Sequence, residues 1–136
     1  MSAMEKVAWV ELVVSVVAVA VVTALFPWLG NGALGAFGLL AFVVCGTFFL
    51  RRRGQAVVVD ERDREIERRS TRIGIESAWI GLFLALIAVV LWASYSDRAT
   101  VDKSLLTWLV FAQFAVCYGV KGLVSIVTYR GQRSAP

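Results

Sequence analysis

The sequence predicts an all-α integral membrane protein, a bundle of four transmembrane helices in one domain over residues 1–136. Three observations lead to this prediction: the apolar share of the chain, the length of its apolar runs, and the gathering of its basic residues in one loop. Of the 136 residues, 59% are hydrophobic and 18% are charged, whereas soluble domains are about 45–50% apolar. A bilayer core about 30 Å thick needs about 20 apolar residues of helix, and four runs approach that length.

The first two runs predict a helical hairpin. The first covers residues 7–26 and is followed by Pro27 and a Gly30-Asn31-Gly32 cluster, which indicates a turn. The second covers residues 33–50 and stops at the arginines at 51–53. Small residues let helix backbones approach closely in membranes, and the second run holds three candidates for such packing: Gly35, Gly38 and Gly46.

The third and fourth runs cover residues 73–93 and 105–128. Glu76 lies near the start of the third run, and the fourth run contains Gln113 and Lys121. A polar side chain at mid-membrane usually finds a partner on another helix. We therefore expect Gln113 to hydrogen-bond to a neighbouring helix.

The basic residues predict the orientation in the cell membrane. Eleven Lys and Arg residues flank the runs on one side, namely Lys6, the eight arginines between 51 and 72, Arg130 and Arg133. Only Arg98 and Lys103 flank them on the other side. Because cytoplasmic loops carry the excess of basic residues, we expect both termini and the loop at residues 51–72 to be cytoplasmic.

The end of this loop predicts a helix that continues into the third span. Asp60 is a plausible N-cap, and Glu61 with Asp63 places negative charge at the positive end of the helix dipole. No helix breaker follows, so one helix of about 33 residues, about 50 Å long, should project into the cytoplasm. Arg72 and Glu76 are spaced for an i, i+4 ion pair on this helix.

The loop carries a resemblance to a known family. Asp60, Glu61, Arg62 and Ile66, together with the four-span layout, resemble a family of small uncharacterised prokaryotic membrane proteins that share an Asp-Glu-Arg loop motif. The resemblance implies a membrane location and a helical fold. It brings no established activity, catalytic residue or cofactor.

Three ionisable residues lie inside the predicted spans: Glu11, Glu76 and Lys121. Charged groups in hydrocarbon are costly and are functional candidates for that reason. Glu76 has an oppositely charged partner, Arg72, one turn away on the same helix, whereas Glu11 has no such partner on its own helix. We therefore hypothesise that Glu11 on the first helix pairs with Lys121 on the fourth inside the bundle. The alternative is that each side chain reaches the membrane interface separately.

Several chemistries are excluded by composition. The chain has no histidine and two cysteines, so it lacks the residues for a histidine-based zinc site, a four-thiolate metal site or a Ser-His catalytic pair. We expect no metal, no cofactor and no enzymatic activity. Nucleic acid is an unlikely partner on chemical grounds, because the charged loop has no aromatic side chain on which bases would stack.

The leading functional interpretation is a non-enzymatic interaction or regulatory protein. The charged helix would contact a cytoplasmic protein, anionic lipid or a second copy of the chain in a parallel homodimer, through Asp60, Glu61, Arg62, Asp63, Arg64 and Ile66. The competing interpretation of these residues is a solvated face with weak i, i+4 pairs.

A second functional interpretation is a small proton-coupled transporter that uses Glu11. The position of Glu11 resembles the first-span glutamate of small multidrug-resistance exporters, which are also compact four-helix proteins. Those proteins have weakly biased loops that suit insertion in both orientations. The strong charge bias here departs from that pattern.

Overall fold

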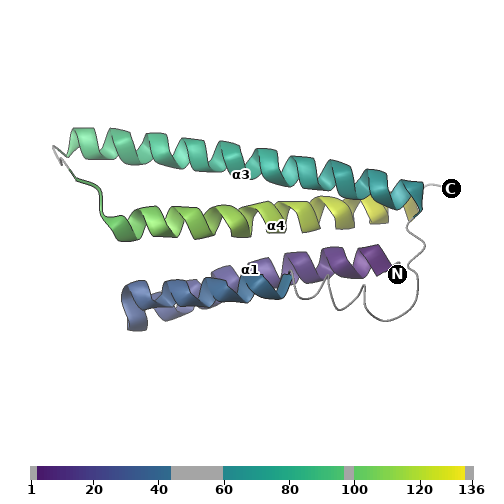
Figure 1. Cartoon of the computed structure of the whole chain (residues 1–136), viewed down its shortest axis with the longest axis horizontal. Coiled ribbons are helices and arrows are strands. Elements are labelled where there is room, and N and C mark those ends of the chain that lie inside the picture. Colours follow the sequence, from purple (N-terminus) through teal and green to yellow (C-terminus); the bar gives the residue numbers. More distant parts are fainter. Residues whose placement is uncertain (1–2, 44–59, 97–99, 134–136) are drawn as a thin grey trace.

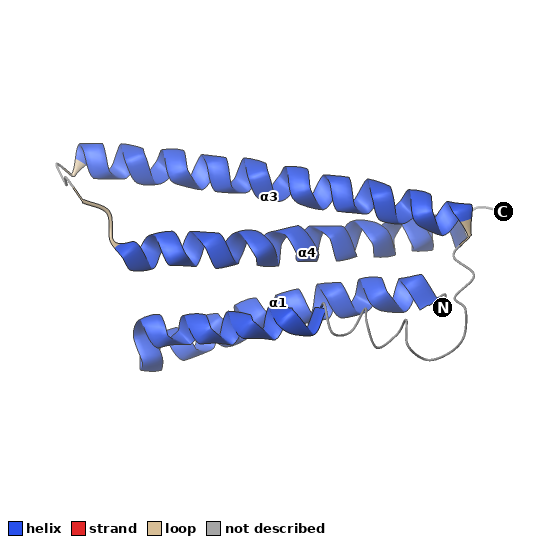
Figure 2. Ribbon diagram, viewed as in Figure 1, coloured by secondary structure: helices blue, strands red, loops and turns tan. Residues whose placement is uncertain are grey.

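The computed structural model describes residues 3–43, 60–96 and 100–133. Every regular element among these residues is helical (Figure 2). In chain order these are the α-helix α1, the 3₁₀ helix η1, and the α-helices α3 and α4, which cover Ala3–Leu29, Gly30–Leu40, Glu61–Tyr95 and Lys103–Arg133. A short α-helical stretch at residues 41–43 follows η1.

The helices lie roughly side by side, with α4 between α1 and α3 (Figure 1). The chain reverses after α1, and η1 runs back along it. The start of α1, the start of α3 and the end of α4 lie together, and we call this the terminal end of the bundle. The opposite end, where α1 meets η1 and α3 approaches α4, is the turn end.

Three segments of the described chain are long and apolar enough to cross a membrane: Met4–Val43, Glu61–Tyr95 and Lys103–Gly131. The prediction of four separate spans is therefore not met. The second apolar run forms no long helix of its own among the described residues, because its first part is the 3₁₀ helix that continues from α1. The rest of that run, residues 44–50, lies outside the described residues.

The chain reverses between α1 and η1 at the Gly30-Asn31-Gly32 cluster, where the sequence analysis expected a turn. Pro27 does not end α1, which continues to Leu29. The chain turns at Gly30, whose φ of +53° is left-handed. Glycine adopts this conformation readily because it has no Cβ, so the glycine rather than the proline marks the corner.

The charged loop does end in the helix that the sequence predicts. Asp60 is extended and its side chain accepts a hydrogen bond of 2.7 Å from the backbone N–H of Glu61, which caps α3. From there α3 runs without interruption for 35 residues. It does not project alone, however, because Ile66 and Ser70 are buried in the bundle. The prediction of one continuous helix is confirmed, and its projection into the cytoplasm stays a prediction.

The turn half of the bundle has a small apolar core built around aromatic rings. Phe37 of η1 stacks on Phe111 of α4, with ring centroids 5.6 Å apart. Trp108 meets both Phe26 and Phe37 edge-on, at 5.5 and 5.7 Å. These rings pack around a buried cluster formed by Ala18, Val22, Phe37, Leu40 and Ala115.

Candidate functional site

A buried ion pair joins α1 to α4 near the terminal end. Lys121 Nζ donates a hydrogen bond of 2.7 Å to Glu11 Oε1. The Glu11 side chain is 3% exposed and that of Lys121 is 16% exposed. The structure thus brings together the two charges that the sequence analysis hypothesised as partners. An isolated charge in such surroundings would be strongly disfavoured, and each of these residues supplies the countercharge of the other.

Two glycines beside this pair let the helix backbones approach closely. A Cβ added at Gly122 would lie 2.8 Å from both Ala8 O and Leu12 N of α1. A Cβ added at Gly74 of α3 would lie 2.7 Å from Cys117 O and 3.0 Å from Lys121 Cβ. Real side-chain carbons do not approach backbone so closely. These contacts fix α1 and α3 on α4 at the level of the ion pair.

The glycines that the sequence analysis selected are not the ones that pack. Gly35 and Gly38 have nothing within 4 Å of an added Cβ, so the prediction of close packing there is wrong. Gly46 lies outside the described residues. Gln113 is half-buried, and its side chain has no hydrogen bond to another described residue. The only sequence signal for Gly122 was its place directly after Lys121 in an apolar run.

A small cavity of about 20 Å³ reaches the ion pair. It is bounded by all three long helices, and its lining includes Glu11, Ile66, Lys121, Ser125 and Tyr129. A polar space of this size has room for about one water molecule. Ser15 does not compete for the Glu11 carboxylate, because its hydroxyl donates to the backbone oxygen of Glu11 at 2.8 Å.

At the terminal end the inward side of α3 is held by α4. The Tyr129 hydroxyl donates a hydrogen bond of 2.8 Å to Asp63 Oδ1. Ile66 and Ser70 are buried one and two turns farther along α3, and the Ser70 hydroxyl donates to Glu67 O at 3.0 Å. Ile66 is therefore a packing residue, and it is not available to a cytoplasmic partner as the sequence analysis expected.

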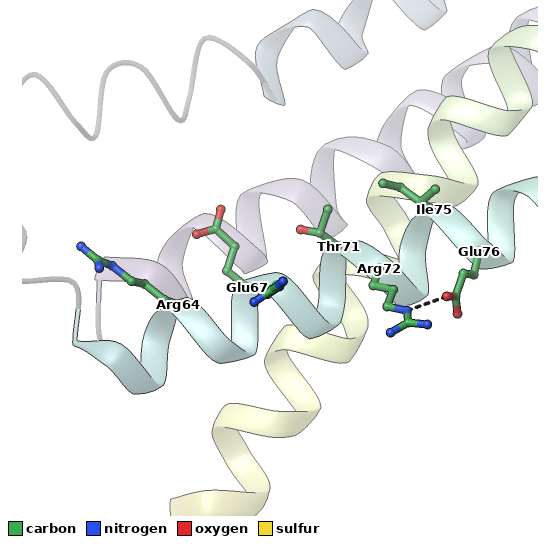
Figure 3. A pocket seen from close by; sticks show the side chains of 7 residues that line it. Arg64, Glu67, Thr71, Arg72, Ile75 and Glu76 are labelled. Carbon is green, nitrogen blue, oxygen red and sulfur yellow. Dashed lines mark hydrogen bonds and ion pairs between the residues drawn. The ribbon is translucent and has the colours of Figure 1, made fainter.

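The outward side of the same turns forms an open, charged hollow of about 580 Å³ (Figure 3). We call it the α3 hollow, and its lining residues are Arg64, Glu67, Arg68, Thr71, Arg72, Ile75 and Glu76. Arg72 Nε donates to Glu76 Oε1 at 2.7 Å, as their i, i+4 spacing predicts. Of the other residues proposed for this surface, Asp60 and Glu61 form the helix cap, and Arg62 is exposed.

The arrangement offers two kinds of chemistry. Near the membrane-spanning part it has a buried carboxylate and ammonium with space for water, and on α3 it has an exposed row of guanidinium groups. Among the described residues, no three His, Cys, Asp or Glu side chains gather in a way that would hold a metal ion.

One comparison with known proteins identifies the family. The family model described as "Predicted membrane protein (DUF2178)" matches residues 4–128, nearly the whole chain. The chain therefore belongs to this family and is a multi-pass helical membrane protein. No curated protein and no solved structure matches it significantly.

Proposed function

We propose that this DUF2178 protein is a non-enzymatic interaction protein whose α3 hollow binds an acidic segment of a cytoplasmic protein. One observation carries the proposal: the first turns of α3 are held on their inward side, while their outward side presents arginines. Arg64 and Arg68 line the hollow and form no ion pair with another described residue. Glu67 and Glu76 also line the hollow, and Glu76 pairs with Arg72. Arg64 and Arg68 are therefore the guanidinium groups suited to carboxylates, which arginine binds in a bidentate manner.

The position of the membrane follows from the level of the ion pair. Glu11, Gly74 and Lys121 lie at the same height in the bundle. From that level to the turn end, α1 extends from Glu11 to Leu29 and α4 from Lys121 back to Lys103, each about 27 Å at 1.5 Å per residue. This length fits a hydrocarbon core of about 30 Å. We place the inner edge of that core at the ion pair.

Side-chain exposure supports this placement. The first large exposed hydrophobic residue is Val13 in α1 and Ile75 in α3, each just past the ion pair toward the turn end. Leu123 and Val127 of α4 are exposed on the other side of that level, where they would meet headgroups. The contact between Asp63 and Tyr129 also lies there. The sequence analysis expected the fourth span to end at residue 128, and Lys103–Gly131 is apolar enough to cross a membrane. In the placement proposed here, the part of α4 within the hydrocarbon core would end near Lys121.

The length of the arginine row favours a protein over lipid as the occupant. Arg64, Arg68 and Arg72 are spaced i, i+4 and i+8, so they share one side of α3 and extend about 12 Å along it. The headgroup layer is only about 5–7 Å thick on each side of the bilayer. Arg72, about 3 Å from the level of Gly74, would lie within it, whereas Arg68 at about 9 Å and Arg64 at about 15 Å would lie beyond it in water.

Photocrosslinking at Thr71, inside the α3 hollow, tests the proposal in membranes of the native host. We expect a protein adduct that disappears in the Arg64→Glu/Arg68→Glu variant. Arg69→Glu is the matched control, because Arg69 is an exposed arginine of the same helix that does not line the hollow. Adducts to lipid alone, an adduct with the mass of two copies of the chain, or equal loss in the Arg69→Glu control would contradict the proposal.

A specific observation favours a second candidate, a proton-coupled transporter. The cavity beside Glu11 and Lys121 would admit water to a carboxylate that is otherwise buried. Proton flux into proteoliposomes, compared between the unchanged protein and Glu11→Gln, separates the two functions. Flux that Glu11→Gln abolishes would favour transport over our first proposal, and no flux in either sample would remove support for transport.

A further inference from the structure

A second, larger cavity lies at the turn end, remote from the ion pair and the α3 hollow. Its volume is about 710 Å³, within the range of about 300–1,000 Å³ typical of small-molecule sites. All of the described helices contribute to it, because α1, η1, α3 and α4 supply Phe26, Asn31, Trp92 and Trp108 respectively. The connection before α4 also lines it, through residues 100–102, so the cavity depends on the whole turn end of the bundle.

The walls of this cavity combine aromatic rings with one negative charge. Phe26 and Trp108 line it and hold each other edge-on at 5.5 Å, so the position of the indole is fixed. Of the described residues around the cavity, Asp102 alone carries a charge. Aromatic faces attract cations through their quadrupole, and the carboxylate adds to this attraction.

Asp102 has capacity left for a ligand. Its Oδ1 accepts from the backbone N–H of Ser104 at 3.0 Å, and its Oδ2 accepts from the Ser104 hydroxyl at 2.7 Å. Each carboxylate oxygen has about two acceptor sites, so one on each oxygen remains. The two hydrogen bonds hold the pKa of Asp102 below its usual value, which keeps the group ionised at neutral pH. Its negative charge is not neutralised by an ion pair with another described residue.

We propose that this cavity binds an amphipathic organic cation, an ammonium group on an apolar body, with Asp102 opposite the charge and Phe26 and Trp108 against the apolar part. The ammonium group could come from a free cation or from a lipid headgroup, since the cavity lies at the end of the bundle where a membrane interface is expected. This inference is independent of the α3 hollow and of any transport activity.

The probe for the test is benzyltrimethylammonium, and its neutral isostere, 2,2-dimethylpropylbenzene, has the same shape without the charge. Binding is measured by tryptophan fluorescence of the full chain in phosphatidylglycerol nanodiscs, with empty nanodiscs subtracted. We expect saturable binding of the cation at least about ten-fold tighter than that of the isostere, because the attraction depends on charge.

The decisive variant is Asp102→Asn, which removes the charge and keeps an oxygen that caps α4. Affinity for the cation should fall about ten-fold while the circular dichroism spectrum is unchanged. Glu61→Gln, an acid removed at the terminal end, should leave the affinity unchanged. Absence of saturable binding, equal binding of the isostere, or an unaltered affinity in Asp102→Asn would overturn the proposal.

The source of the cation is resolved by a second set of nanodiscs that contain phosphatidylethanolamine. Competition with the probe would identify the lipid headgroup as the occupant. An unchanged affinity for the probe would exclude the phosphatidylethanolamine headgroup and favour a free cation as the occupant. Both results are compatible with the proposed site. The proposal itself is tested by whether the affinity depends on the charge of the probe and on the charge of Asp102.

Discussion

The two ends of this bundle are held together by different chemistry. Near the terminal end, glycines bring the backbones of α1 and α3 against α4, and a buried ion pair fixes the register. At the turn end, aromatic rings pack between α4 and both α1 and η1. The closely packed end has a cavity of about 20 Å³, whereas the aromatic end has one of about 710 Å³. Glycines let two helices approach until little space remains between them, whereas aromatic side chains hold the helices apart and leave a cavity between them.

This difference in packing fits the different roles that we propose for the two ends. A closely packed terminal end gives the α3 hollow a rigid base, which lowers the entropy cost of binding a partner. A spacious turn end provides room for a ligand that enters between helices. The predictions below test the difference, from the largest expected effect to the smallest.

Breaking the ion pair should have the largest effect on stability. Glu11→Gln leaves Lys121 without its countercharge, and removal of one partner from a buried pair costs about 3–5 kcal/mol. The free energy of unfolding in detergent should fall by about 3 kcal/mol, since Lys121 retains some contact with solvent. Exchange of the charges, Glu11→Lys with Lys121→Glu, should restore part of the loss.

Glu76→Gln, which removes the exposed pair with Arg72, is the control for this experiment and should change stability too little to resolve. If Glu76→Gln destabilised the protein as much as Glu11→Gln does, then burial would not explain the contribution of the Glu11–Lys121 pair to stability.

Adding a methyl group at the glycine contact between α1 and α4 should cause the second-largest loss of stability. Gly122→Ala forces its methyl group against the backbone of α1 at Ala8 and Leu12, and overpacking of this kind costs about 1–3 kcal/mol. Gly119→Ala, one turn away on α4, meets only Ser15 Cβ at an ordinary 3.7 Å. Because alanine is the better helix former, Gly119→Ala should be neutral or stabilising. Equal melting temperatures for the two variants would contradict the close contact.

Removal of the hydroxyl that anchors α3 should have a smaller effect. Tyr129→Phe deletes the hydrogen bond to Asp63, and a bond of this kind contributes about 1 kcal/mol at a partly exposed site. Hydrogen exchange in the first turns of α3 should accelerate. Tyr118→Phe is the control, because Tyr118 is also a half-buried tyrosine of α4 and has no hydrogen bond to another described residue. Equal acceleration in both variants would argue against this anchor.

The smallest effect is expected at the exposed cap of α4, and it should depend on pH. The hydrogen bonds from Ser104 lower the pKa of Asp102 below its ordinary value. A lowered folded-state pKa stabilises the fold above the unfolded value, and the contribution is lost as pH falls through the folded value. The melting temperature of Asp102→Ala should therefore be slightly lower than that of the unchanged protein at pH 7, and the gap should close below about pH 4. A gap that does not narrow as the pH falls would show that the charge is not responsible.

The sequence was sufficient for features that depend on local chemistry. The cap at Asp60, the continuous α3 and the Arg72–Glu76 pair follow from neighbouring residues along one helix. The partnership of Glu11 and Lys121 was accessible as a hypothesis, because two opposite charges in apolar runs have few other partners.

The sequence was not sufficient for features that depend on how helices are rotated against each other. Nothing local distinguishes Gly122, where an added Cβ would meet the backbone of α1, from Gly38, where an added Cβ would meet no described atom within 4 Å. Ile66 lies in a charged segment, so its sequence context suggests a surface position, but the rotation of α3 buries it. The cavity at the turn end likewise exists only once four elements are brought together.

The central claim is that the ion pair marks the inner edge of the hydrocarbon core, so that the end of the α3 hollow at Arg64 lies in water and its other end, at Ile75, meets lipid. Its most direct test is a scan of spin labels along the outward side of α3, at Arg64, Arg68, Thr71, Ile75, Trp79 and Phe83, in nanodiscs with Cys45 and Cys117 replaced by serine. We predict contact with a water-soluble relaxation agent up to Thr71 and contact with oxygen, which concentrates in lipid, from Ile75 onward. Lipid contact that extends to Arg64, or water contact that continues to Phe83, would contradict the account.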